Sequence, residues 1–280
     1  MIEYLDSTIF QLQWPLPILV IMGGMTLIAF IAYKAKSLTI GGAVGAFIMG
    51  FIILWATSFS GFFLFLLFFV SCTLVGKISK RIRFTTLDKE VAEKKGHTRD
   101  FMQVLANGLM ATIAALLWSI SLEKTALVMF GAAVAEATSD TFAGEIGRLS
   151  RCQPVSILNF KPVPKGLSGG VTVLGLIAAF LSSAAIALFW YLWFYDVSVL
   201  EAVLVCTMGF AGCLLDSVLG AGVQGIYYNP KAKQFSEDKE RDGRKLELSR
   251  GIRWVDNDVV NLISNIFSGL FAFGMCSLIL

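Results

Sequence analysis

Carboxylates and small side chains alternate in the segment AEATSDTFAGEIG, residues 135–147. A helix turns by about 100° per residue, so this spacing predicts one polar or small stripe, while Glu145 points elsewhere. Carboxylates in a membrane segment are costly and usually serve a function, although one of them could instead bond only to a neighbouring helix. The predicted stripe consists of Glu136, Ser139, Asp140, Ala143, Gly144 and Gly147.

Acids and amides recur with helical spacing in three other segments. Asp216 is the only acid in the second half of an apolar run that also contains Gly209, Gly212 and Gly220, which let other helices approach it. The deepest amides, Asn107 and Asn265, are explained equally well as interhelical hydrogen-bonding groups. One of the other two segments carries Arg99, Asp100, Gln103 and Asn107. The second carries Asp256, Asn257, Asp258, Asn261 and Asn265.

A lysine and glycine-rich turn, KGLSGGVT, precedes another apolar run at residues 165–172. Backbone N–H groups at a helix N-terminus suit a phosphate, and a nearby lysine adds a mobile positive charge. The Walker pattern GxxxxGK[ST] is absent from the segment. The alternative is that these glycines serve only as a turn. The candidate phosphate-binding residues are Lys165, Gly166, Ser168, Gly169 and Gly170.

The elements that must position these groups are membrane helices. The 280 residues are 56% hydrophobic and only 15% charged, whereas soluble domains carry about 25% charged residues. This composition excludes a soluble globule, a disordered chain and a basic nucleic-acid-binding module. Five scattered cysteines without a CxxC pair, and the single histidine His97, argue against a disulfide framework and a zinc site.

Eight apolar runs are long enough to cross a bilayer, which predicts an all-α polytopic membrane protein with a single integral membrane domain over residues 1–280. Every Lys and Arg except Lys124 then falls on one side, which the positive-inside rule assigns to the cytoplasm. Both termini are expected outside, in the cell membrane if the source is prokaryotic. Long cytoplasmic loops are expected at 77–100, 147–168 and 221–257, with 231–250 a solvated loop or a short surface helix. The expected spans are 16–33, 38–56, 59–76, 101–120, 126–146, 169–194, 199–220 and 258–280.

This topology brings the cytoplasmic ends of the polar runs to a similar depth. Arg99, Asp100, Asp140, Lys165, Asp216 and Asp256 are therefore expected to converge on one cytoplasm-facing pocket. Carboxylates combined with amides, lysine and arginine indicate Mg²⁺ together with phosphates, because magnesium takes oxygen ligands and shares them with substrate phosphates.

The motifs from Arg99 to Asn107, EATSDTFAGEIG, KGLSGGVT, Asp216 to Gly220 and DNDVVN, in this order, resemble the transmembrane protein 19 family. That family, also catalogued as a family of unknown function, includes the plant phytyl-phosphate kinase. The resemblance covers nearly the whole chain. It implies a membrane enzyme that phosphorylates an isoprenoid monophosphate to the diphosphate with a nucleoside triphosphate, CTP being favoured. Some relatives carry cysteine and histidine in the last cytoplasmic loop, and this chain has none between Ala221 and Val255.

Phosphoryl transfer needs positioning and charge neutralisation. A monophosphate with a second pKa of about 6 is already largely ionised, so no general base is required. The apolar tail of the acceptor is expected between spans. The roles follow as catalytic Asp140, Lys165 and Asp216; Mg²⁺ ligands Glu136, Asp140, Asp216 and Asp256; and substrate or phosphate contacts Arg99, Gln103, Asn107, Gly166, Ser168, Gly169, Gly170, Asn257 and Asn261.

Three alternatives remain at the level of sequence. A cytidylyltransferase that forms a CDP-activated lipid would use the same metal and phosphate groups. A transporter or flippase for a prenyl phosphate or another anion would explain intramembrane acids and glycine-broken helices, but the polar residues concentrate in the cytoplasmic halves of the spans. A helix bundle that serves only as a scaffold leaves the acids unexplained.

Overall fold

A computed structural model of the chain describes residues 2–86, 98–230, 234–241 and 243–279. Among them, six helices are long and apolar enough to cross a membrane. They are α2 (Leu16–Lys34), α3 (Ile40–Thr86), α5 (Phe101–Ser121), α7 (Val173–Trp193), α8 (Val199–Gly222) and α9 (Asn257–Ile279). The predicted polytopic helical membrane protein is confirmed. The number of eight crossings and the side on which the termini lie stay predictions.

The long helix α3 is two helices joined at Ser58, whose φ of 57° and ψ of −163° are not helical. The break separates the two runs predicted as the second and third spans. A short helix, α1 (Ile2–Phe10), lies beside this corner, where Asp6 Oδ1 accepts a hydrogen bond of 3.1 Å from the Phe59 N–H. Asp6 thereby satisfies one of the backbone donors that the start of a helix leaves open. We call residues 40–57 and 59–86 the first and second arms of α3.

Helix α6 (Lys124–Gly147) occupies the centre of the bundle, in contact with α3, α5, α7, α8 and α9. Every residue from Thr125 to Ser139 on this helix is buried. Its apolar side chains join those of the surrounding helices in the main core, where Trp190 of α7 donates a 3.0 Å hydrogen bond to the Leu127 carbonyl. Because other helices surround α6, its polar residues face protein groups rather than lipid, which is how such residues are accommodated in a membrane.

Side-chain caps fix where three of these helices begin. Asp100 and Gln103 form a capping box at the start of α5, and Ser198 and Glu201 form another at α8. Thr172 accepts a 3.1 Å hydrogen bond from the Gly175 N–H at the start of α7. Such caps satisfy otherwise unpaired backbone donors at helix N-termini. The predicted sixth span, 169–194, therefore begins as a helix only at Val173.

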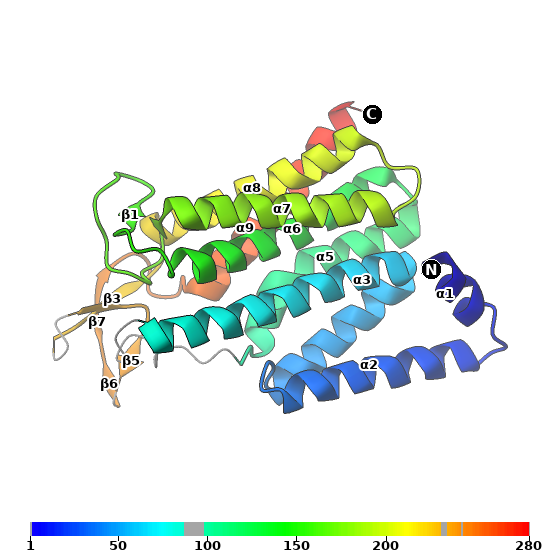
Figure 1. Cartoon of the computed structure of the whole chain (residues 1–280), viewed down its shortest axis with the longest axis horizontal. Helices are drawn as coiled ribbons and strands as arrows, with labels where there is room; N and C mark the ends of the chain where they lie inside the picture. The colour runs from blue at the N-terminus through cyan, green and yellow to red at the C-terminus, as the bar shows by residue number, and fades with distance from the viewer. Residues whose placement is uncertain (1, 87–97, 231–233, 242, 280) are drawn as a thin grey trace.

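Short strands gather at one end of the bundle, whereas α1 and the end of α9 lie at the opposite end (Figure 1). One pair joins β1 (Val155–Ser156) to β2 (Gly170–Val171), and another joins β5 (Glu240–Arg241) to β6 (Arg244–Lys245). The third sheet has the order β4-β3-β7, all neighbours antiparallel. Its strands are β3 (Ile226–Asn229), β4 (Gln234–Ser236) and β7 (Glu247–Arg250).

Two loop predictions are corrected by this arrangement. The described part of the stretch 231–250 contains strands instead of a plain loop or a surface helix, because β4 and β7 pair with β3, and β5 pairs with β6. The loop predicted to begin at Lys77 is still helical to Thr86. Ser79 donates a 2.8 Å hydrogen bond to the Glu145 carbonyl, and Arg83 lies 3.1 Å from Glu145 Oε2, so α6 holds this extension. Residues 87–97, including His97, lie outside the described residues.

Candidate functional site

Two carboxylates from different helices meet at the strand end of the bundle. Asp140 of α6 and Asp216 of α8 lie within hydrogen-bonding reach of each other and line the same pocket. Asp216 Oδ2 also accepts a 2.9 Å hydrogen bond from the Asn261 amide and lies 3.3 Å from Ser264 Oγ, both on α9. Two ionised carboxylates at this separation repel each other, so the pair requires a shared proton or a bound cation.

Glu136 lies behind this pair, one helical turn deeper, and is 1% exposed. Its two oxygens accept hydrogen bonds from Ser264 Oγ at 2.7 Å and from Asn265 Nδ2 at 2.6 Å. Asn265 also donates to the Ala133 carbonyl at 2.8 Å, so its amide is an interhelical group that joins α9 to α6. The structure thus places Glu136 in a buried network beneath the acid pair.

Glycines of α8 permit this close approach, as their stripe predicts. A Cβ added at Gly212 would lie 2.5 Å from Glu136 Cγ and 2.9 Å from Ser268 Cβ. At the end of the same helix, a Cβ on Gly220 would lie 3.0 Å from the Gly169 backbone nitrogen. These positions let α8 contact the acid network and the glycine-rich turn at once.

The turn at 165–172 folds against the end of α8. Gly166 and Gly169 have φ values of 83° and 80°, a region that favours glycine. The Ser168 N–H donates a 3.0 Å hydrogen bond to Glu237 Oε1, and the Ser168 hydroxyl contacts the same oxygen. Lys165 Nζ donates to the Ser150 carbonyl at 2.8 Å. The turn therefore already binds an anionic group, supplied by the segment after β4.

Arg99 is held from the other side of the bundle. Its backbone exchanges hydrogen bonds with the turn before α3, from Arg99 N–H to the Ser37 carbonyl at 2.9 Å and from Thr39 N–H to the Arg99 carbonyl at 3.0 Å. Gly42 leaves room for this contact, because a Cβ there would run into the Arg99 carbonyl. Its guanidinium lies over the rings of Phe68 and Phe69, at 5.9 and 6.0 Å from their centroids. The small residues at 41–45 thus pack against the segment that carries Arg99.

Two polar pockets result, and they share one wall. The glycine-side pocket, with about 900 Å³ of empty space, lies between Asp140, Asp216 and the 165–172 turn. The arginine-side pocket, with about 980 Å³, contains Arg99, Gln103, Asn107 and Asn261. The residues lining both are Asp140, Gly144, Arg148 and Asn257. The expected single pocket is therefore a pair of pockets joined at Asp140.

Two of the converging acids lie elsewhere. Asp256 lines neither pocket, and its Oδ2 accepts a 2.9 Å hydrogen bond from Lys239 Nζ. Partial burial would raise the pKa of Asp256, but the hydrogen bonds from Lys239 and the Val259 N–H outweigh it and hold the pKa below its usual value. Asp100 is used in the capping box with Gln103, whose backbone N–H donates to Asp100 Oδ1 at 3.0 Å.

Five charged residues that line the two pockets are absent from the sequence-based set, namely Lys77, Glu145, Arg148, Glu237 and Asp258. Arg148 lines both pockets, and Glu145 contacts it at 3.4 Å as well as Arg83. Glu237 reaches the glycine-rich turn from 69 positions away. The position of Arg148 one turn after Gly144 could have indicated it, since it continues the cytoplasmic end of α6. Nothing in the sequence signals the contact made by Glu237.

The acidic side chains of the site fit a magnesium ion only in part. Across the described ranges, no group of three or more His, Cys, Asp and Glu side chains is placed to hold a metal ion. The four-acid cage of the sequence prediction is therefore not formed. Magnesium is, however, commonly bound through one or two carboxylates, waters and substrate phosphates. The adjoining Asp140 and Asp216 fit that smaller requirement.

Comparison with known proteins identifies the family. Residues 23–269 match the model of the family described as "Integral membrane protein DUF92". The chain belongs to this family. The resemblance drawn from the motifs is thereby confirmed. The matched residues run from the middle of α2 to the middle of α9 and include every helix between them.

Relatives of this DUF92 chain include proteins of an archaeon and of a plant. An "Uncharacterized membrane protein MJ0933" of Methanocaldococcus jannaschii is 38% identical over 69% of this chain and 78% of its own length. "Protein PGR" of Arabidopsis thaliana is 27% identical over 85% of this chain and 89% of its own. "Protein VTE6, chloroplastic" from the same plant is 25% identical over 87% of this chain and 66% of its own length. No solved structure matches the chain.

Proposed function

We propose that this DUF92 chain is a prenyl-phosphate kinase that transfers the γ-phosphoryl group of a nucleoside triphosphate to an isoprenoid monophosphate. The observation that carries the proposal is the junction at Asp140 of two polar pockets, one with a glycine-rich turn and a lysine, the other with Arg99 and amides. A phosphoryl-transfer enzyme needs two phosphate-binding regions that meet at acidic groups. Family membership and the similarity to Protein VTE6 accord with this function.

In this proposal the nucleotide phosphates occupy the glycine-side pocket. The Ser168 N–H, which donates to Glu237 in the structure, would donate to a phosphate oxygen after Glu237 withdraws. Lys165 is exposed at the same pocket and would pair with the phosphates. CTP is favoured as the donor by the family resemblance.

The acceptor phosphate occupies the arginine-side pocket. Arg99 supplies positive charge, and Asn107, which donates one amide hydrogen to the Gln103 carbonyl, keeps a second hydrogen for the phosphate. Gln103 uses its side-chain oxygen in the capping box, which leaves its amide N–H groups for the pocket. Arg148, on the shared wall, can contact the transferred group from either side.

The proposed step is a direct displacement. An acceptor phosphate oxygen forms a bond to the γ-phosphorus, the bond from that phosphorus to the β–γ bridging oxygen breaks, and nucleoside diphosphate leaves with the electron pair. Asp140 and Asp216 would hold Mg²⁺, which supplies charge neutralisation for the phosphates when bound. Glu136, fixed by Ser264 and Asn265, holds the acid pair in position from below.

The deciding experiment follows the nucleotide products. Purified protein in lipid nanodiscs is incubated with Mg²⁺, geranylgeranyl phosphate and CTP labelled on either the α- or the γ-phosphate. The kinase releases CDP and transfers the γ-label to the lipid. A cytidylyltransferase instead releases pyrophosphate and transfers the α-label. Absence of any product, combined with movement of prenyl phosphate across a vesicle bilayer, would favour the transporter and overturn the proposal.

A further inference from the structure

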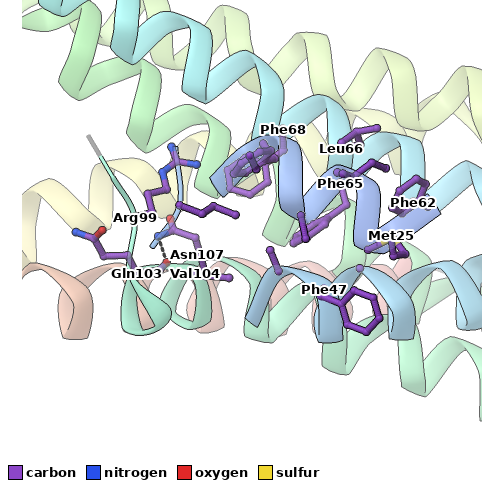
Figure 2. A pocket seen from close by; sticks show the side chains of 17 residues that line it. Met25, Phe47, Phe62, Phe65, Leu66, Phe68, Arg99, Gln103, Val104 and Asn107 are labelled. Carbon is purple, nitrogen blue, oxygen red and sulfur yellow. Dashed lines mark hydrogen bonds between the residues drawn. The ribbon is translucent and has the colours of Figure 1, made fainter. Parts of the chain in front are cut away.

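A third cavity, almost wholly apolar, opens between α2, both arms of α3 and α5, and contains about 650 Å³ of empty space. Figure 2 shows Met25, Phe47, Phe62 and Phe65 along it, with Arg99 at its other end. No residue of the acid pair reaches this cavity.

Small residues keep this space open. Ala29 and Ala32 of α2 and Ala46 and Gly50 of the first arm of α3 all line it. A Cβ added at Gly50 would run into the end of the Met25 side chain. Met25, Gly50 and Phe62 therefore close the end of the cavity that lies farthest from Arg99.

The other end joins the polar site. Arg99, Gln103 and Asn107 line both the apolar cavity and the arginine-side pocket. The guanidinium over the Phe68 and Phe69 rings marks the boundary between the two environments. A ligand that matches this surface has one anionic end and one long hydrocarbon end.

We infer that the apolar cavity binds the hydrocarbon tail of the acceptor, with the phosphate beside Arg99 and the tail end against Met25 and Phe62. This assignment rests on the proposed function, because it takes the ligand to be a prenyl phosphate. Membrane lipid is as apolar as the cavity wall, so entry of the tail gains little from the hydrophobic effect. The cavity therefore acts on selectivity, and its depth sets the tail length that the site accepts.

Two variants change the depth in opposite directions. Ala46→Leu adds side-chain volume to the cavity lining and should favour acceptors of 10 carbons over 20 carbons by about tenfold in kcat/KM. Met25→Ala deepens the far end and should shift the preference toward longer chains. Gly24→Leu is the control, because nothing lies within 4 Å of a Cβ at this exposed position of the same helix α2. The control should keep the wild-type profile over geranyl, farnesyl and geranylgeranyl phosphates.

A labelling experiment tests the site without turnover. Geranylgeranyl phosphate with a diazirine at its tail end is bound to the full chain in nanodiscs and irradiated, and the labelled peptides are sequenced by mass spectrometry. The inference predicts labels on α2 near Met25 and on α3 near Phe62, displaced by unlabelled geranylgeranyl phosphate and not by phosphatidylglycerol.

The outcomes separate the two proposals. If the labels appear at these positions but the protein forms no product, the proposed tail site stands and the proposed kinase activity is refuted. If the wild-type protein turns over but the labels lie elsewhere, or if both variants keep the wild-type preference for acceptor length, the proposed tail site is refuted and the proposed kinase activity stands. Equal displacement by phosphatidylglycerol would identify a membrane-lipid site and overturn the inference.

Discussion

Acidic side chains on α6 and α8 differ sharply in what surrounds them. Asp140 and Asp216 contact each other at a pocket, Glu136 is enclosed by α9 donors, and Glu145 turns to Arg83 and Arg148. Helix geometry predicted that Glu145 lies off the stripe. Gly144, four positions after Asp140, completes about one turn and returns to the same face, whereas Glu145, five positions after Asp140, is rotated beyond that face. The role of each carboxylate follows from these partners.

We predict that Asp140→Asn and Asp216→Asn each lower turnover by about 100-fold or more, because each removes one oxygen ligand from the charged centre. Glu145→Gln should lower turnover by less than tenfold, since this residue lies in an ion-pair network at the pocket wall. The measurement is the initial rate of CDP release at several Mg²⁺ concentrations. Thermal unfolding and gel-filtration profiles control for folding.

Equal losses of turnover in all three variants would show that Glu145 matters as much as Asp140 and Asp216, and would refute the separate role assigned to it. Wild-type activity in either aspartate variant would remove the proposed metal role.

At the scale of elements, the position of the site depends on close helix contacts that glycine permits. The spacing of Gly209, Gly212 and Gly220 was visible in the sequence, and so was the start of α5 after Asp100, whereas the start of α7 was predicted four residues too early. The contact of Glu237 with Ser168 and the pairing of Asp256 with Lys239 were not visible. These contacts depend on how short strands fold over the bundle, and local spacing carries no information about such long-range pairing.

Gly212→Ala tests the close contact between α6 and α8. A methyl group there would lie 2.5 Å from Glu136 Cγ, so we predict a loss of about 1–3 kcal/mol in the free energy of unfolding from overpacking. Turnover should fall as well, because displaced Glu136 disturbs Ser264 and Asp216. The matched control is Gly274→Ala on α9, where nothing lies within 4 Å of the added methyl. An unchanged melting temperature for Gly212→Ala would contradict the packing described.

At the scale of the whole molecule, the segregation of basic residues predicts which end of the bundle faces the cytoplasm. The glycine-rich turn and the ends of α6 and α8, which line the glycine-side pocket, lie at the end that carries the strands (Figure 1). Hydropathy and charge predicted the helical architecture and the position of the α3 break. Hydropathy and charge predicted no strand at this end, because strands of two to four residues are too short to produce a recognisable residue pattern.

Cysteine labelling measures this orientation. Cys152 is exposed at the strand end, whereas Cys72, Cys213 and Cys276 are buried and Cys206 is partly buried. A membrane-impermeant maleimide should label Cys152 in inverted vesicles and not in intact cells. In a Cys152→Ser background, Ser121→Cys, exposed at the opposite end, should show the reverse pattern. Labelling of Cys152 in intact cells would invert the assigned topology.

The central placement of α6 also bears on how the chain is made. Glu136 of α6 is satisfied by Ser264 and Asn265, and these residues are translated more than 120 positions later. Until then, α6 carries carboxylates that a lipid environment penalises by about 2.5–3.5 kcal/mol each on insertion scales. We therefore expect stable integration of α6 to wait until α9 has been translated. Chains truncated before α9 should consequently be recognised by membrane quality control, even though most of their helices are complete.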